Sequence, residues 1–362
     1  MDILVVHPSL NEGGGSEKVA LSIIKSLKER GHNVALAAFE KTNWKKVTKF
    51  FGQNCEADIE FTYPRIFGMS AYGELLNFHL LLSRIPRKYK TVITSTSSPW
   101  FYCPQAEKSI VYFNCSPVNY KYGLKRAYLL PYNYIQHKLL KKAKKTILLT
   151  NSTFSAEAIK NVYLLDATVI YPPVDIEVFR PSSQKEDLIV TLGRFNPSKK
   201  HETLIRAFSM VKRGRCIIIG SVRKRDSIKY LKKLKQLVND LKINRKVDLI
   251  VNCSFSMVRN ILSKAKIYVH CAPFEYFGVS VVEAMASGCV PIVYRGGGPY
   301  TDIIEYNKYG ISFKDPHELA RKINSLLDDD NLYKKLAEKA IRRSKIFSAN
   351  NFKNKIVEIV EL

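Results

Sequence analysis

Short apolar runs alternate along the chain with stretches in which apolar residues recur every three or four positions. Helical spacing is clearest after the first run, where Val19, Leu21, Ile24 and Leu27 fall on one face of a helix expected over 16–30. The apolar runs that we expect to be strands are 2–7, 33–39, 91–96, 110–113, 146–150, 187–192, 216–220, 247–251, 267–272 and 290–294. Because strands that alternate with helices form parallel sheets through right-handed crossovers, the pattern predicts an α/β fold.

The predicted strands fall into two sets that are separated by a proline pair. The chain has 362 residues, more than one hydrophobic core usually holds. Pro172 and Pro173 remove backbone donors and fix φ, so no regular element is expected to cross them. We therefore expect one domain over 1–172, a second over 173–349, and a last helix over 350–362.

A glycine-rich turn follows the first predicted strand. Gly13, Gly14 and Gly15 allow a ligand to approach the backbone, and Ser16 is a candidate cap for the next helix. The turn matches neither the G-x-G-x-x-G of dinucleotide-binding proteins nor the Gly-Lys-Ser/Thr ending of a P-loop. Nicotinamide and ATP chemistry are therefore disfavoured, while a purely structural turn stays an alternative.

A second candidate site lies where the strand over 267–272 ends at Pro273. Glu275 follows in the loop, and Gly278 is expected to open a helix that contains Glu283 and stops at Gly288. The first N–H groups of a helix have no partner within it, which suits phosphate. Two carboxylates therefore flank a candidate anion site, although an ordinary helix with solvated glutamates has the same spacing.

Two cations follow the strand over 187–192. In the loop Gly193-Arg194-Phe195-Asn196-Pro197-Ser198-Lys199, glycine and proline allow Arg194 and Lys199 to converge before a helix that begins near Glu202. Arginine binds two phosphate oxygens through its planar fork, and lysine adds a compact charge. The loop is a candidate diphosphate site, and a solvated basic loop is the alternative.

These motifs together resemble the retaining glycosyltransferases of GT-B fold known as group 1 or family 4. The carrying segment is Glu275 to Glu283 with the inner sequence F-G-x-S-x-x-E-A-M-A-S-G, and the family's G-G-x-E turn, G-R-x-x-x-x-K motif and Y-P-P-V-D segment also occur in order. The resemblance implies two Rossmann-like, doubly wound parallel-sheet domains that face each other across a cleft. It also implies that the helix over 350–362 packs back on the first domain.

The resemblance assigns roles to the motif residues. It places Glu283 on the ribose and Glu275 near the transferred sugar, with Glu17 as the acidic residue of the first glycine turn. It makes Glu275, Arg194 and Lys199 the candidate catalytic residues. The remaining donor-binding groups that it implies, through backbone or charge, are Gly14, Gly15, Arg194, Lys199, Phe277, Gly278 and Val279. It further implies a nucleotide diphosphate sugar as co-substrate, no cofactor and no metal.

The acceptor side departs from the family pattern. Lipid-linked mannosyltransferases of the family often have a histidine two residues before a proline, and here Cys115 takes that position, with Asn114 beside it. A histidine-based role near the acceptor therefore cannot be carried over. Asn114 and Cys115 are acceptor-side candidates by position alone.

The charge of the chain points to an anionic partner. The formal net charge is +26, and eight basic residues but no acidic one lie within 121–145, among tyrosines and leucines. That mixture suits a helix in a lipid headgroup layer, and a solvated basic helix face is the alternative. The basic run over 223–235 is expected to be a solvated face, with nucleic acid as the less favoured interpretation.

Other features limit the location and the metal chemistry. No apolar run reaches the length of a membrane span, and the N-terminus lacks the features of a signal peptide, so we expect a cytoplasmic protein, peripheral on the inner face of the membrane. The seven cysteines form no C-x-x-C pair and are expected to be small buried apolar residues. The run Asp328-Asp329-Asp330 lies between two helical stretches, away from any strand end, and is rejected as a metal site.

We therefore expect a retaining, metal-independent glycosyltransferase. It would move a hexose of mannose or glucose type from a nucleotide diphosphate sugar, GDP-mannose or a UDP-sugar, to a hydroxyl of a lipid-linked or glycan acceptor. The alternatives are a basic nucleic-acid-binding protein on a doubly wound scaffold, and an epimerase or phosphorylase of the same fold.

Overall fold

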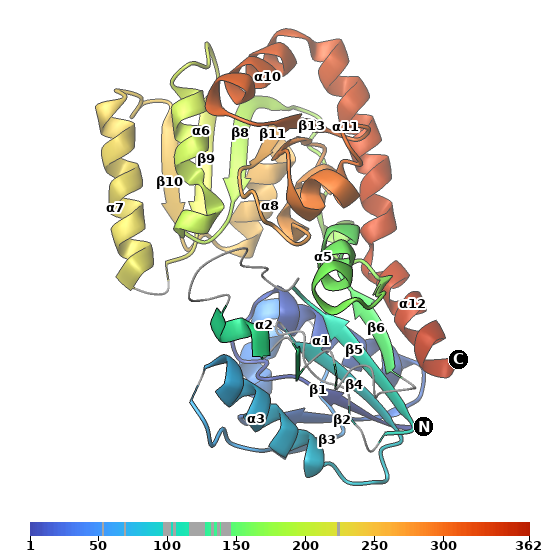
Figure 1. Ribbon diagram of the computed structural model, residues 1–362. Coiled ribbons are helices and arrows are strands. Elements are labelled where there is room, and N and C mark those ends of the chain that lie inside the picture. Colours follow the sequence, from blue (N-terminus) through green and yellow to red (C-terminus); the bar gives the residue numbers. More distant parts are fainter. Residues whose placement is uncertain are drawn as a thin grey trace. The chain divides into compact units, whose positions relative to one another are not determined.

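The computed structural model describes residues 1–52, 54–68, 70–96, 103, 106–115, 127–131, 134–135, 138, 146–222 and 225–362. The chain divides into two compact units (Figure 1). The first contains Met1–Pro173 together with Ala349–Leu362, and the second contains Val174–Ser348. Each unit has its own parallel sheet, so the α/β class predicted from the apolar pattern is confirmed.

The first unit is built on a seven-stranded sheet in the order β3-β2-β1-β4-β5-β6-β7. Every strand pair in it is parallel. The strands are β1 (Asp2–Val6), β2 (Asn33–Ala38), β3 (Ile59–Thr62), β4 (Thr91–Thr96), β5 (Lys108–Phe113), β6 (Thr146–Thr150) and β7 (Thr168–Val169). The direction in which the chain adds strands reverses between β1 and β4, where open sheets of this kind bind ligands.

Helices cover both faces of the first sheet because successive strand residues point to opposite sides. Ile3 and Val5 belong to the core under α1 (Gly15–Glu29), α2 (Trp44–Phe51) and α12 (Ala349–Glu361). Leu4 and Val6 belong to the core under α3 (Ala71–Ser83) and α5 (Thr153–Tyr163). The alternation in β1 thus explains the doubly wound arrangement.

The last helix, α12, packs on the first unit although it follows the second in the chain. Phe352, Ile356 and Val360 enter the core that contains α1. At the surface, Arg30 Nε lies 2.9 Å from Glu361 Oε1. Apolar burial therefore docks this helix, and an exposed ion pair adds little.

The second unit has a six-stranded sheet in the order β10-β9-β8-β11-β12-β13, again with parallel pairs. Its strands are β8 (Glu186–Leu192), β9 (Arg215–Gly220), β10 (Val247–Val251), β11 (Ala265–His270), β12 (Val290–Tyr294) and β13 (Ile311–Phe313). Here the direction of winding reverses between β8 and β11. The loops that follow these two strands therefore share the ligand-binding edge.

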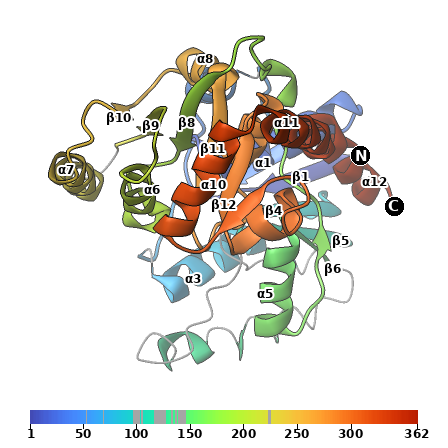
Figure 2. The ribbon, with the colours of Figure 1, turned by 90° about the horizontal axis from the view of Figure 1, so that it is seen from above.

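Helices pack on both sides of this second sheet, as the view from above shows (Figure 2). One core joins the sheet to α6 (His201–Phe208), α7 (Arg225–Asp240), α10 (Pro316–Asp328) and α11 (Asp330–Ser344). The helices α8 (Phe255–Lys264) and α9 (Val279–Ala286) pack against β8 and against β11 with β12, respectively. The cations of α7 lie on its exposed side, as expected for a solvated basic face.

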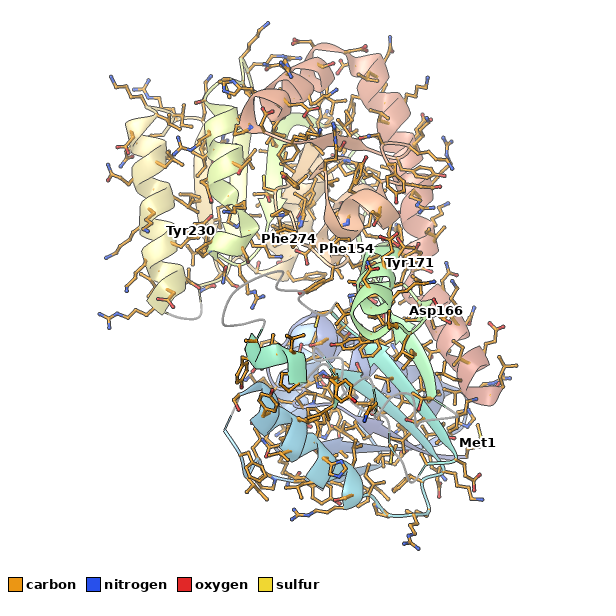
Figure 3. All side chains as sticks on the ribbon, in the orientation of Figure 1. Met1, Phe154, Asp166, Tyr171, Tyr230 and Phe274 are labelled. Atoms are coloured by element: carbon orange, nitrogen blue, oxygen red, sulfur yellow. The ribbon has the colours of Figure 1, made fainter. Side chains whose placement is uncertain are left out.

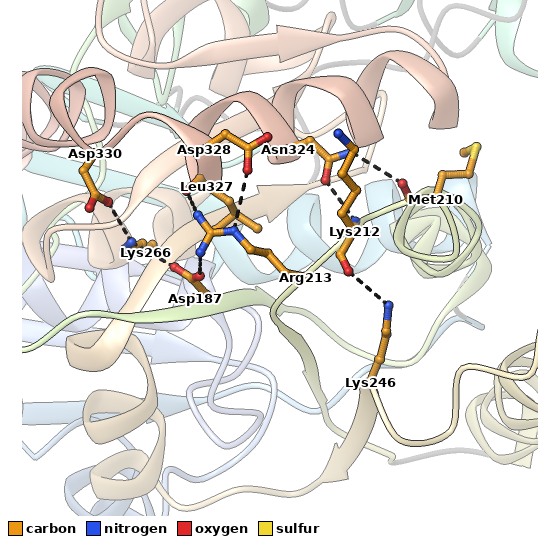
Figure 4. A network of polar contacts seen from close by, with 10 residues as sticks. All are labelled: Asp187, Met210, Lys212, Arg213, Lys246, Lys266, Asn324, Leu327, Asp328 and Asp330. Carbon is orange, nitrogen blue, oxygen red and sulfur yellow. Dashed lines mark hydrogen bonds and ion pairs between the residues drawn. The ribbon is translucent and has the colours of Figure 1, made fainter.

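A polar network joins the start of β8 to the ends of α10 and α11 (Figure 4). Arg213 contacts Asp187 and Asp328, and Lys266 Nζ lies 2.8 Å from Asp187 and 2.9 Å from Asp330. Asp329 accepts a hydrogen bond from Leu332 N and so caps α11. Asp329 thus caps a helix, and Asp328 and Asp330 form ion pairs. All three lie at the edge of the sheet opposite the loops after β8 and β11.

Three expectations need correction or comment. The helix α1 begins at Gly15 with Gly14 as its N-cap, so Ser16 lies in the first turn and is not the cap. Cys103, Cys216, Cys271 and Cys289 are buried thiols, as expected, but Cys55, Cys115 and Cys253 are half-buried. Within the described part of the chain, no helix combines the length and the apolar character needed to cross a membrane.

Candidate functional site

The loop after β8 is held firmly at both ends, and it presents Arg194 to solvent. Gly193 N and Phe195 N donate to Ile219 O and Ser221 O at 3.0 and 3.1 Å, and the Phe195 ring is fully buried. The Asn196 side chain caps a short 3₁₀ turn, Pro197–Lys199, that leads into α6. Because the neighbours of Arg194 are fixed, its exposed guanidinium projects from a rigid base.

His201 supports this loop from the start of α6. Its Nε2 lies 3.3 Å from Arg194 O, and its backbone N donates to Tyr230 Oη at 3.1 Å. Burial lowers the pKa of His201 to about 4, although the contact with Arg194 O opposes this change. At neutral pH the imidazole is therefore uncharged and acts as a hydrogen-bonding support for the Arg194 backbone.

The loop after β11 brings Glu275 against Lys199. Lys199 Nζ forms an ion pair with Glu275 Oε2, and His270 Nε2 lies 3.3 Å from the same oxygen. Burial by itself would raise the pKa of Glu275, but its contacts with His270 and Lys199 outweigh this effect and hold the pKa well below the ordinary value of 4.5. The Glu275 carboxylate is therefore kept ionised. The neighbouring Phe274, which is labelled in Figure 3, is exposed.

The depressed pKa of Glu275 predicts a specific dependence of stability on pH. A carboxyl that ionises more easily in the folded protein stabilises it fully above its unfolded pKa, near 4.5, and loses this contribution as the pH falls through the folded value. We therefore expect the free energy of unfolding of the unchanged protein to fall more steeply below about pH 4.5 than that of Glu275→Gln. Urea unfolding at a series of acid pH values measures both slopes, and equal slopes would contradict the assigned contacts.

A second glycine-rich loop fixes the backbone that carries Glu275. Gly298 N donates to Glu275 O at 2.8 Å, and a Cβ placed on Gly298 would lie 2.1 Å from Tyr276 O. Gly297 has φ +73°, and its Cβ would lie 2.5 Å from Glu275 O. These two glycines are therefore required for the close approach of the two loops.

The helix α9 starts beside Glu275. Its N-cap, Gly278, has φ +98° and offers no side chain to the first N–H groups of the helix. Tyr268 Oη donates to Ser280 Oγ at 2.7 Å and lies 3.3 Å from Leu192 O, which ties the first turn of α9 to the end of β8. Phe277 is buried, whereas Val279 and Glu283 are half-buried in α9. The second unit thus brings together Arg194, Lys199, Glu275, Phe277, Gly278, Val279 and Glu283 on the edge formed by β8, β11 and α9.

The glycine turn of the first unit follows β1 at the reversal point of that sheet. Gly13 has φ +66°, and its missing side chain leaves room for the Phe50 ring, which would lie 2.7 Å from a Cβ. Gly14 caps α1, and a Cβ there would lie 2.6 Å from Glu17 Oε2. Gly15 has no neighbour within 4 Å of a Cβ. Local packing therefore accounts for Gly13 and Gly14, while Gly15 is open.

Asn114 and Cys115 lie where β5 ends. Asn114 Nδ2 donates to Ser95 Oγ at 3.0 Å and to Thr96 O at 3.1 Å, and Asn114 O accepts from Asn151 Nδ2 at 2.7 Å. Burial raises the pKa of the Cys115 thiol to about 12. Asn114 thus joins the ends of β4, β5 and β6, and Cys115 stays a neutral thiol.

Sequence reasoning missed His270 as a site residue. It is the last residue of β11, is 3% exposed, and lies against the carboxylate expected to contact the sugar. A polar residue that ends an otherwise apolar strand, five positions before Glu275, is the signal that could have identified it.

Two family models match the chain. Residues 175–343 match "Glycosyl transferases group 1", and residues 13–178 match "Glycosyltransferase Family 4". The chain belongs to the group 1 glycosyltransferases. The recognised family, and with it the expectation of an enzyme that transfers sugar, is therefore confirmed, which sets aside a nucleic-acid-binding protein on the same scaffold.

Curated relatives of this glycosyltransferase share about a quarter of its residues. The chain is 22% identical to the GDP-Man:Man(3)GlcNAc(2)-PP-Dol alpha-1,2-mannosyltransferase of Dictyostelium discoideum, over 98% of this chain and 83% of the relative. It is 25% identical to the mouse (Mus musculus) protein of the same name, over 82% of this chain and 73% of the relative. The family resemblance to lipid-linked mannosyltransferases thus extends over most of both chains.

Solved structures show the fold of this glycosyltransferase. The structure of Anabaena Alr3699/HepE in complex with UDP superposes with a TM-score of 0.79 at 18% identity and covers all of both chains. A glycosyltransferase from Rickettsia africae ESF-5 gives a TM-score of 0.76 at 22% identity, over 99% of this chain and 97% of the other. The GT-B fold, with two Rossmann-like domains, is therefore confirmed.

Proposed function

We propose that this glycosyltransferase moves a hexose from a nucleotide diphosphate sugar to a hydroxyl of a lipid-linked glycan, with retention at the anomeric carbon and without a metal ion or cofactor. The donor that we favour is GDP-mannose, and a UDP-hexose is the second choice. The names of these curated relatives, which specify GDP-Man and a PP-Dol-linked glycan, support a guanosine donor and a dolichol-linked acceptor.

The observation that carries this proposal is the exposed guanidinium of Arg194 at the reversal point of the second sheet. Its guanidinium is exposed and forms no ion pair with any residue that the structure describes, although the loop around it is rigid. Lys199, six positions after Gly193, forms an ion pair with Glu275. A guanidinium held at this edge suits a diphosphate, because two of its N–H groups can donate to two phosphate oxygens at once.

Catalysis by these groups would be electrostatic. Sugar transfer leaves negative charge on the departing diphosphate, and fixed cations or helix N–H groups lower the barrier by stabilising that charge. Arg194, Lys199 and the uncapped start of α9 can supply this stabilisation without a metal. A single well-placed donor lowers the barrier by about 3 kcal/mol.

Glu275 has a supporting role in the proposed reaction. Because its pKa is held low by His270 and Lys199, it stays an anion that can orient the sugar or stabilise positive character at the anomeric carbon. We do not assign it as a nucleophile. In the proposed course the acceptor hydroxyl attacks the same face from which the diphosphate leaves, and a phosphate oxygen takes the proton.

The donor's nucleoside would lie along α9. Glu283, in the second turn of this helix, is half-buried, and we propose that its carboxylate accepts hydrogen bonds from the ribose hydroxyls. Gly14 and Gly15 of the first unit are proposed to contact the donor phosphates, for which the open space at Gly15 is suitable.

The acceptor is proposed to be reached at a membrane surface. Most of 121–145 lies outside the described residues, but four of its described side chains are large, apolar or aromatic, and exposed: Tyr128, Leu130, Tyr134 and Ile135. Tyr72 of α3 donates to Tyr128 O at 2.7 Å, so Tyr128 is held against α3. Exposed apolar residues within a strongly basic stretch favour binding to anionic lipid. Flotation with anionic vesicles tests this contact, which neutral vesicles should not support.

A thermal-shift screen tests the donor assignment. A ligand that binds only the folded protein raises the unfolding temperature with the logarithm of its saturation. We expect GDP and GDP-mannose to raise the midpoint more than UDP, UDP-glucose and ADP do. A larger shift with UDP would change the base, and the absence of a shift with every nucleotide would refute the proposed site.

A further inference from the structure

His270 Nε2 is a buried polar atom without a hydrogen bond. The residue is 3% exposed, and although Nε2 lies 3.3 Å from Glu275 Oε2, it makes no aligned hydrogen bond to any described group. A buried N–H that lacks a partner is costly. Such an atom in a rigid strand, at the edge that forms the site, therefore calls for a reason.

The reason lies in the oxygen that His270 shares with Lys199. Both side chains approach Oε2 of Glu275, and Lys199 forms the ion pair with it. The proposed donor diphosphate needs the same lysine. Lys199 cannot contact the diphosphate at full strength while it remains on Glu275, so donor binding would leave this half-buried carboxylate without its cation.

We propose that His270 is a positioning residue that takes over Glu275 Oε2 when Lys199 moves to the donor diphosphate. The imidazole Nε2–H then donates to Oε2 and keeps the carboxylate ionised and oriented toward the sugar. This inference deepens the proposed function and rests on it, because it requires a diphosphate that draws Lys199 away. No bond to the substrate is assigned to His270.

The charged groups around His270 are compatible with this exchange. Glu275 faces it from the following loop, Lys199 from the loop after β8, and His201 from α6. His201 is uncharged at neutral pH and is engaged with Arg194 O, so it does not compete for Glu275. When Lys199 leaves, His270 is thus the donor that remains beside Glu275 Oε2.

Kinetics of His270 variants test the exchange. We expect His270→Leu to lower kcat by about 10-fold to 100-fold, the range for a hydrogen bond to a charged group, while the Kd for GDP or UDP changes by less than about threefold. His270→Gln, whose amide N–H can replace Nε2–H, should restore kcat to within about threefold of the unchanged enzyme. His317→Gln, at an exposed position on α10, is the matched control.

Two outcomes of these kinetics would overturn the inference. One is a kcat of His270→Leu within about threefold of the unchanged enzyme. The other is a parallel loss of kcat, nucleotide binding and folded protein in both His270→Leu and His270→Gln, which would indicate a merely structural histidine.

A stability cycle gives a readout that needs no activity. Lys199→Ala and His270→Leu each leave Glu275 one partner, whereas the double variant leaves it none. We therefore expect the double variant to lower the urea midpoint by more than the sum of the two single changes. In a Glu275→Gln background the excess should disappear, because no charged carboxylate remains.

The cycle separates failure of this inference from failure of the proposed function. Additive midpoints would overturn the sharing of Glu275 Oε2 even if the enzyme transfers sugar from a nucleotide donor. If the midpoints are non-additive but the protein binds no nucleoside diphosphate, no ligand is available to draw Lys199 away from Glu275. That result would refute both the exchange and the proposed function.

Discussion

Replacing Arg194 with alanine is expected to lower kcat for sugar transfer by about 100-fold to 1,000-fold, the effect of removing one preorganised donor from a developing anion. The folded structure should be unchanged, because the guanidinium is exposed and forms no ion pair with a described residue, while Phe195 and the loop backbone hold the turn. Steady-state kinetics with GDP-mannose and UDP-glucose, together with thermal unfolding, measure both quantities.

Two further variants sharpen this experiment. Arg194→Lys keeps the charge but loses the planar fork, so we expect it to recover only part of the activity. Arg206→Ala removes an exposed arginine from α6, next to the same loop, and should leave kcat unchanged. Normal turnover by Arg194→Ala would exclude the role assigned to this residue.

Substituting alanine for Gly298 should damage the site through the backbone. The added Cβ would lie 2.1 Å from Tyr276 O and 3.0 Å from Phe277 Cα, and neither neighbour is a side chain that can rotate away. The loop that carries Glu275 must therefore shift. A displacement of about 1 Å can cost about 100-fold in rate, and overpacking typically costs about 1–3 kcal/mol of stability.

Gly68→Ala is the control for this prediction, because a Cβ at Gly68 meets nothing within 4 Å and its φ is not in the left-handed region. Kinetics and urea unfolding of both variants separate a local displacement from a general effect of the substitution. If Gly298→Ala kept the activity and stability of the unchanged protein, the close approach of the two loops would be refuted.

The sequence was sufficient for the elements whose apolar pattern is long. β1, β8, β11 and the helix that carries Glu283 all follow from periodicity and glycine positions. The edge strands β3 and β13 were not predicted, because Ile59–Thr62 and Ile311–Phe313 are short and lack a continuous apolar run. Edge strands are specified largely by the neighbour with which they pair, which local sequence does not show.

The candidate site could be predicted only as a set of motifs. The order of the strands, which places the loops after β8 and β11 side by side, depends on crossovers that periodicity cannot choose. The ion pair between Lys199 and Glu275, and the approach of His270 to the same oxygen, span 76 and five residues of sequence and arise only once the sheet has formed. The cap of α1 is Gly14 and not Ser16, because the backbone enters the helix two residues earlier than the capping preference of serine predicts.

The most direct test of the central claim is to incubate the full chain with GDP-mannose, or with UDP-glucose, in the presence and absence of a polyprenyl-diphosphate-linked oligosaccharide, and to analyse the products by NMR. We expect release of the nucleoside diphosphate together with a glycosylated lipid whose new linkage keeps the anomeric configuration of the donor, and loss of both products in Arg194→Ala. An inverted linkage would contradict the retaining course, and failure to release nucleoside diphosphate from either donor would contradict sugar transfer at this site.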